Sequence, residues 1–235
     1  ENVPALTGRA FAAWSFWSCS DALEPLDKLL EMEPDNVYAN LFRGSNRLFA
    51  GVEVEAGVAD LERALELSPD SPDVRFVVAD AYTYALPDPP RAYEEAQQAL
   101  SLGLDTPRIH AILATSLVEA GDLDTAAYHL DQHITQVTRE YVSTAPLEVG
   151  SSMTLDLVPW QTFRIPIDLN VEEQIVIGTG SDSTQVWDSI LVLLGPDGTP
   201  VIGNDDFDGF YAGLDWMAPE AGRYTIRVTS FEGIN

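Results

Sequence analysis

The chain has 235 residues, of which 38 are acidic and 12 are basic, so its formal net charge at pH 7 is -26. Because 46% of the residues are hydrophobic, the composition predicts a folded protein of one or two domains and excludes a disordered acidic tail. The acidity also argues against nucleic acid and anionic membrane surfaces as partners, because both are bound through clustered Lys and Arg.

Three further features bound the class of protein. No apolar run approaches 18 residues, so we expect no direct insertion into a membrane. A lone cysteine, Cys19, excludes an intrachain disulfide and is expected to be a small packing residue. The sequence starts at Glu1 without a methionine, which favours an extracytoplasmic protein, whether secreted, periplasmic or at the cell surface.

Residues 5–141 carry apolar side chains at helical spacing, and this part of the chain repeats itself. Three similar segments, Leu29–Asp35, Ala64–Asp70 and Ala99–Asp105, follow one another at intervals of 35 residues. Each segment ends a helix and turns the chain, and a fourth unit runs from Pro107 to Tyr141. The period predicts an array of helix pairs.

These units resemble the tetratricopeptide repeat (TPR), a helix pair of ~34 residues with small and large apolar residues at fixed places. The second unit has a wide turn around Gly51 and Gly57. The matching residues are Ala22, Leu26 and Pro34 in the first unit, Leu61, Ala64 and Pro69 in the second, Val78, Ala79, Tyr82, Ala96 and Ala99 in the third, and Leu113, Ala114, Leu117, Gly121, Ala126 and Leu130 in the fourth. The resemblance implies an α-solenoid of about four helix pairs over residues 1–142.

The resemblance also implies a groove, lined by the first helices of the pairs, that holds a partner protein. The groove candidates are Asn40, Arg43, Arg47, Asp80, Tyr84, Thr115 and Glu119, for which solvated or packing roles are the alternative. His129 and His133 lie four residues apart and could share a metal, but with no third ligand at helical spacing we expect ordinary packing or surface roles.

From Leu147 onward the apolar runs shorten to the length of strands. Examples are 174–178, 189–194 and 223–228, and Gly195–Gly198 has the composition of a turn. About seven such runs predict an antiparallel β-sandwich over residues 143–235. The whole chain is therefore expected to be a multidomain α + β protein, divided between residues 142 and 143.

The order of motifs from Trp187 to Val228 looks like the bacterial pre-peptidase C-terminal (PPC) domain, a secreted β-sandwich, and implies a jelly-roll-like fold. In that family a further hairpin and closing strand follow, whereas here the chain stops at Asn235. Either the last strand is missing from this sequence or an open edge is left, which would allow self-assembly by strand addition.

Acidic and amide residues gather around the predicted turns of this domain: Asp188, Asn204, Asp205, Asp206 and Asp208. Ca²⁺ takes six to eight oxygen ligands, and a divalent ion would relieve repulsion among these carboxylates. Asp and Asn also occupy turns for purely conformational reasons, so a calcium site and plain turn formation are both open.

No catalytic fingerprint is present, and the chain is expected not to be an enzyme. We expect an exported or cell-surface scaffold that binds a partner protein through the repeats, with a calcium-stabilised sandwich as a second contact. The alternatives are an accessory chain of a secreted enzyme, or a polysaccharide- or matrix-binding module with the stacking candidates Trp160, Trp187, Trp216, Phe207, Phe210 and Tyr211.

Overall fold

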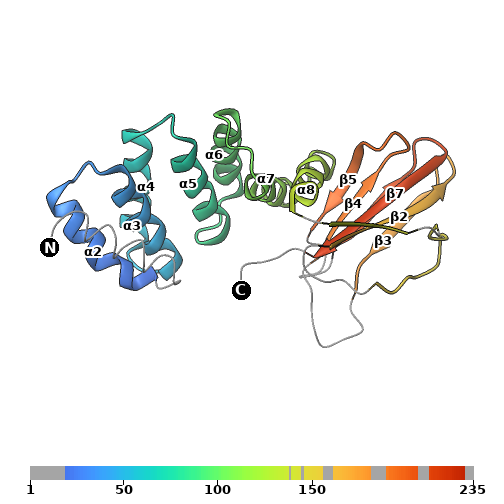
Figure 1. Cartoon of the computed structure of the whole chain (residues 1–235), viewed down its shortest axis with the longest axis horizontal. Helices are drawn as coiled ribbons and strands as arrows, with labels where there is room; N and C mark the ends of the chain where they lie inside the picture. Colours follow the sequence, from blue (N-terminus) through green and yellow to red (C-terminus); the bar gives the residue numbers. More distant parts are fainter. Residues whose placement is uncertain are drawn as a thin grey trace. The chain divides into compact units, whose positions relative to one another are not determined.

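The computed structural model describes residues 19–137, 139–143, 146–155, 161–180, 189–205 and 212–230, which form helices and then strands (Figure 1). The helices are α2 (Cys19–Met32), α3 (Val37–Ala50), α4 (Val54–Leu67), α5 (Pro72–Tyr84), α6 (Pro89–Ser101), α7 (Pro107–Glu119) and α8 (Leu123–Val137). The strands are β1 (Arg139–Val142), β2 (Gln161–Leu169), β3 (Gln174–Gly178), β4 (Ser189–Leu194), β5 (Pro200–Asn204), β6 (Gly213–Met217) and β7 (Gly222–Ser230). The chain folds as two compact units, residues 1–105 (unit 1) and residues 106–235 (unit 2).

The helices of unit 1 begin and end where local side chains favour it. Asn36, Ser71 and Asp88 precede α3, α5 and α6, and each accepts a hydrogen bond from the backbone N–H three residues further on. Prolines stand in the first turns of α5 and α6, where a backbone N–H would have no hydrogen-bond partner within the helix. Gly51 ends α3 with a φ of 65°, a conformation that glycine adopts without strain.

Small residues let the paired helices of unit 1 approach closely. A Cβ atom on Gly44 of α3 would lie 2.7 Å from the carbonyl oxygen of Gly57 in α4. Ala79 of α5 and Ala96 of α6 are fully buried. Because α4 begins at Val54, Gly57 lies inside a helix, and the wide turn predicted around Gly51 and Gly57 is wrong in this respect.

Unit 2 contains a five-stranded sheet in the order β1-β2-β7-β4-β5 and a two-stranded sheet of β3 and β6. All neighbouring strands are antiparallel except β1 and β2, which are parallel. The strand-rich part that the sequence predicted is therefore present, while the finer jelly-roll arrangement stays a prediction. β7 is paired on both sides, by β2 and β4, so the outer strands of the described five-stranded sheet are β1 and β5, and self-assembly through an open edge stays a prediction.

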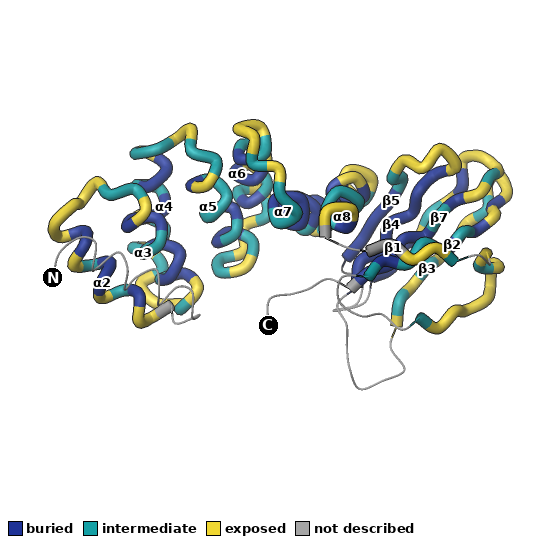
Figure 2. Tube along the Cα trace, in the orientation of Figure 1, coloured by how far each residue is buried: buried dark blue, intermediate teal, exposed yellow. Residues whose placement is uncertain are grey.

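Both faces of the five-stranded sheet are covered, which explains the unbroken apolar run of β4. Leu191 and Leu193 belong to a core that includes Ile175 of β3 and Leu214 of β6. The side chains between them, among them Val192, point to the opposite face. All six residues of β4 are buried, as the dark blue trace of Figure 2 shows, and a strand covered on both sides has no polar face to alternate with.

The second cover of this sheet is the last helix pair. Leu130 and Ile134 of α8 form a buried cluster with β4 residues that include Val192. A Cβ atom on Gly203 of β5 would lie 2.9 Å from the Cα atom of Ala127, so only glycine permits this approach. The helices end at Val137, beside the predicted boundary between residues 142 and 143, whereas the compact units divide between residues 105 and 106.

Candidate functional site

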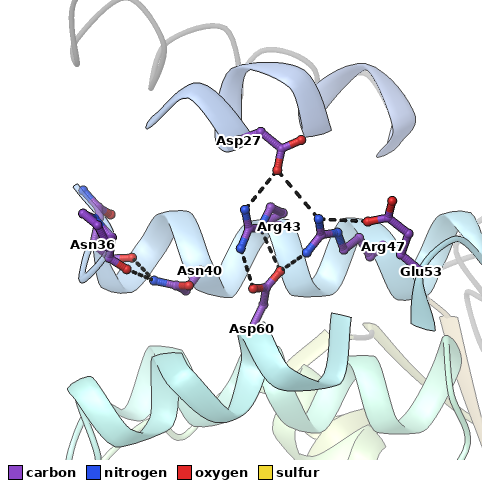
Figure 3. Close-up of polar contacts among 8 residues, drawn as sticks. Asp27, Asn36, Asn40, Arg43, Arg47, Glu53 and Asp60 are labelled. Atoms are coloured by element: carbon purple, nitrogen blue, oxygen red, sulfur yellow. Dashed lines mark hydrogen bonds and ion pairs between the residues drawn. The ribbon is translucent and has the colours of Figure 1, made fainter. Parts of the chain in front are cut away.

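The predicted groove residues Arg43 and Arg47 lie on one face of α3 and bind carboxylates of neighbouring helices (Figure 3). Arg43 donates to both oxygens of Asp60 in α4, at 2.8 and 2.6 Å, and to Asp27 in α2 at 2.9 Å. Arg47 donates to Asp60 at 2.6 Å and pairs with Glu53 at 2.9 Å. These arginines therefore join α2, α3 and α4, and their predicted part in a partner-binding groove stays a prediction.

The centre of this network is buried. Asp60 is only 7% exposed, and its carboxylate receives both guanidinium groups. The hydrogen bond to Asp60 raises the pKa of Arg43 above its ordinary value, although burial acts in the opposite direction. Planar guanidinium groups suit this role, because they can meet a carboxylate with two parallel N–H donors.

Asn40 has a structural role at the turn between α2 and α3. Its side-chain amide donates to the carbonyl oxygens of Pro34 and Asn36, at 3.0 and 2.9 Å (Figure 3). Asn40 is 4% exposed, so these bonds satisfy a buried donor. Its predicted contact with a partner stays a prediction.

A different face of α3 carries aromatic side chains that the sequence interpretation did not select. At 100° per residue, Tyr38, Phe42 and Phe49 lie within about 40° of one another, and Arg43 and Arg47 lie about 140–180° away from Tyr38. The rings of Tyr38 and Phe42 are stacked with their centroids 6.2 Å apart. Tyr38 is 52% exposed and Phe49 is 42% exposed. We call these three residues the α3 aromatic face, whose sequence signal is the spacing of four and seven residues.

Helix α5, which contacts α3, carries two of the predicted groove residues one turn apart. Asp80 is half-buried, and Tyr84 is 38% exposed near the end of the helix. Their spacing of four residues places them on the same side of α5. The α3 aromatic face and Tyr84 are therefore candidate protein-binding residues of unit 1.

The other two groove candidates lie in unit 2. Glu119 is exposed at the end of α7. Thr115 of α7 donates to the carboxylate of Asp205, just after β5, at 3.4 Å. Thr115 therefore forms part of the contact between α7 and the β-rich part of the same unit, and a role in partner binding stays a prediction.

Two of the five predicted calcium ligands, Asn204 and Asp205, are among the described residues, and both are buried. The amide of Asn204 donates to the carbonyl oxygen of Gly213 at 2.9 Å. Asp188, Asp206 and Asp208 lie outside the described residues. Within the described ranges no group of three His, Cys, Asp or Glu side chains could hold a metal ion, so calcium stays a prediction.

Of the six stacking candidates for a polysaccharide, Trp216 is the one that the structure describes. It is half-buried, packs against the apolar core of unit 2 and meets the ring of Tyr224 edge-on, with the centroids 5.3 Å apart. This is a packing role. Trp160, Trp187, Phe207, Phe210 and Tyr211 lie outside the described residues.

The sequence placed His129 near His133, but in the structure His129 pairs with His110. Nδ1 of His129 in α8 lies 2.8 Å from Nδ1 of His110 in α7, and both side chains are buried. His133 instead places its Nδ1 2.9 Å from the carbonyl oxygen of Pro107. Because its partner is 19 residues away, the His110–His129 pair left no local signal in the sequence.

No helix in the described parts of the chain is long and apolar enough to cross a membrane. No protein-family model and no curated protein matches the sequence.

Solved structures do match the fold. MamA from Desulfovibrio magneticus RS-1 (residues 41 to the end) is 20% identical over 57% of this chain and 75% of its own, with a TM-score of 0.50. An O-GlcNAc transferase mutant from Thermobaculum terrenum is 19% identical over 62% of this chain but only 28% of its own, with a TM-score of 0.53. A thermophilic TPR protein from Thermus thermophilus, TTC0263, is 22% identical over 58% of this chain and 74% of its own, with a TM-score of 0.49. The helical part thus has the fold of a TPR array, and the resemblance of the strand-rich part to the PPC domain stays a prediction.

Proposed function

We propose that this chain is a non-catalytic scaffold that binds a partner protein through the α3 aromatic face and Tyr84 of α5. The observation that carries the proposal is the pair of exposed aromatic side chains, Tyr38 and Phe49, on one side of a helix in a TPR array. Large aromatic rings bury much apolar area at little cost in conformational entropy, and they are enriched among residues that dominate protein interfaces.

The charges of unit 1 indicate the chemistry of the partner. Each Lys and Arg side chain in the described part of unit 1 pairs with Asp or Glu; these cations are Lys28, Arg43, Arg47, Arg63, Arg75 and Arg91. In the described part of the unit the positive charges are therefore already engaged, while the chain as a whole is strongly acidic. A partner segment that combines apolar side chains with Lys or Arg fits such a surface best.

A double substitution in the full chain, Tyr38→Ala with Phe49→Ala, tests this proposal. A partner is first captured from an extract of the producing organism and purified, and its affinity is then measured by titration calorimetry. We expect the double variant to bind more than tenfold more weakly, because it removes two aromatic contacts. The matched control is Tyr128→Ala in α8, where the tyrosine is 51% exposed, and it should bind like the unaltered chain. Equal binding by both variants, or equal loss in both, would contradict the proposal.

We further propose that the β-rich part of unit 2 supplies a second contact, that calcium stabilises it, and that the protein acts outside the cytoplasm. Support for calcium comes from the place of Asn204 and Asp205 at the end of β5, directly before Asp206 in the sequence. A ligand that binds only the folded state raises the melting temperature. Melting curves of the full chain with calcium and with chelator should therefore differ, and identical curves would remove calcium from the proposal.

A further inference from the structure

The contact between His110 and His129 is a hydrogen bond that tolerates only some protonation states. The two Nδ1 atoms are 2.8 Å apart, so one must carry a proton and the other must offer its lone pair. If both rings become imidazolium, two N–H groups and two positive charges face each other at this distance. The bond is then lost and replaced by repulsion.

The surroundings of the pair oppose a positive charge. His110 is 2% exposed and His129 is 8% exposed, and the ring of Tyr128 meets both imidazoles edge-on. Burial lowers the pKa of His129 from 6.5 to about 4, and repulsion from His110 acts in the same direction. The neighbouring His133 also has its pKa lowered by burial, with Arg108 of α7 and His110 adding repulsion.

Charged groups from the packed strands are engaged on the other side of α8. Arg227 of β7 donates to Asp131 of α8 and, at 3.2 Å, to Thr135. Asp205, after β5, receives the hydroxyl group of Thr115. The repulsion that lowers the pKa of His129 comes from His110. Helix α8 is thus held to the sheet on one side and to α7, in part through the histidine pair, on the other.

We propose that the His110–His129 pair is an acid-sensitive latch: it holds α7 to α8 at neutral pH, and the contact between the two helices loosens when both imidazoles are protonated. The sign follows from linkage. The unfolded chain binds more protons than the folded chain between pH 6.5 and about 4, so the stabilising effect of a neutral His129 is complete above pH 6.5 and is lost as the pH falls. This inference is independent of the partner proposed above.

The test is made on the full chain by NMR titration of its three histidines, together with hydrogen exchange of the backbone amides. In the unaltered chain we expect His129 to titrate well below its ordinary pKa, and in His110→Asn we expect its midpoint to rise. The control, His133→Gln, removes another buried histidine and should leave the midpoint of His129 low. A midpoint of His129 that is the same in all three proteins would overturn the latch.

Hydrogen exchange gives the structural readout. After correction for intrinsic rates, the amides of α7 and α8 should exchange at least tenfold faster at pH 4 than at pH 7, while those of β2 and β7 should not. Exchange in α7 and α8 that does not depend on pH would also overturn the proposal. Should both variants fail to fold, the imidazole nitrogen signals of the unaltered chain at pH 7 decide: one protonated and one bare Nδ1 support the pair, and any other combination contradicts it.

Discussion

The helix pairs α3–α4 and α7–α8 belong to the same repeat pattern but meet different neighbours. In unit 1, ion pairs join the two helices of the pair to each other and to the helix before them: Arg43 and Arg47 of α3 bind Asp60 of α4 and Asp27 of α2. In unit 2, α8 lies against β4 mainly through the buried side chains Leu130 and Ile134. Helix pairs of one repeat pattern can thus be held by ion pairs between helices in one place and by apolar side chains against a sheet in another.

The largest effect is expected from Asp60→Ala, which removes the carboxylate that Arg43 and Arg47 share. Removing the buried carboxylate leaves Arg43 and Arg47, whose side chains are only 19% and 12% exposed, without their shared counter-charge, which should lower the free energy of unfolding of unit 1 by about 3–5 kcal/mol. Urea unfolding followed by circular dichroism measures the change.

Asp35→Ala is the matched control, because Asp35 also pairs with an arginine, Arg63 of α4, from the turn between α2 and α3, but its side chain is 72% exposed. Water screens that pair, so the control should unfold almost like the unaltered chain. If the two variants were equally stable, burial would not be what makes the Asp60 network strong.

The close contact between the sheet and α8 is tested by Gly203→Ala. The added Cβ atom would press on the backbone of Ala127, so the sheet and α8 must separate slightly, and we expect unit 2 to lose about 1–3 kcal/mol. Gly178→Ala in β3 is the control, because nothing lies within 4 Å of the added atom there. A shift in the melting temperature for Gly203→Ala alone would locate the tight contact under α8, and equal shifts would contradict it.

The smallest effect is expected for Asp168→Ala in β2. Arg223 of β7 donates two hydrogen bonds to Asp168, both at 2.8 Å, and this bonding lowers the pKa of the carboxyl group. Both side chains are more than half exposed, at 65% and 56%. Despite its good geometry, the pair should therefore leave the melting temperature at pH 7 unchanged within error. A clear decrease would show that exposed pairs contribute more here than the comparison implies.

Much of the fold was predictable because its signals are local. The interval of 35 residues locates the ends of α4 and α6, and the fourth unit locates α7 and α8. The shortening of the apolar runs locates the strands after Leu147, whereas β1 (Arg139–Val142) lies in the part that was predicted to be helical. The parallel pairing of β1 with β2 was not predictable, because strand direction depends on partners that are distant in the sequence.

The candidate site was less predictable for the same reason. Family analogy selected Arg43 and Arg47, but the position of Asp60, 17 residues after Arg43, decides what these side chains bind. An unbroken apolar run such as that of β4 is typical of a strand covered on both faces, but periodicity cannot say that a helix pair supplies one cover. The α3 aromatic face was visible as a spacing, and its exposure required the structure.

The engagement of arginines in ion pairs has a consequence for the response to salt. The described residues include seven arginines that pair with carboxylates, in several cases at largely buried positions where mobile ions screen little, while the 38 acidic groups of the chain far outnumber its 12 basic ones. Added salt should then weaken the repulsion among surface carboxylates more than it weakens the buried attractions. We therefore expect the free energy of unfolding to increase as the ionic strength rises.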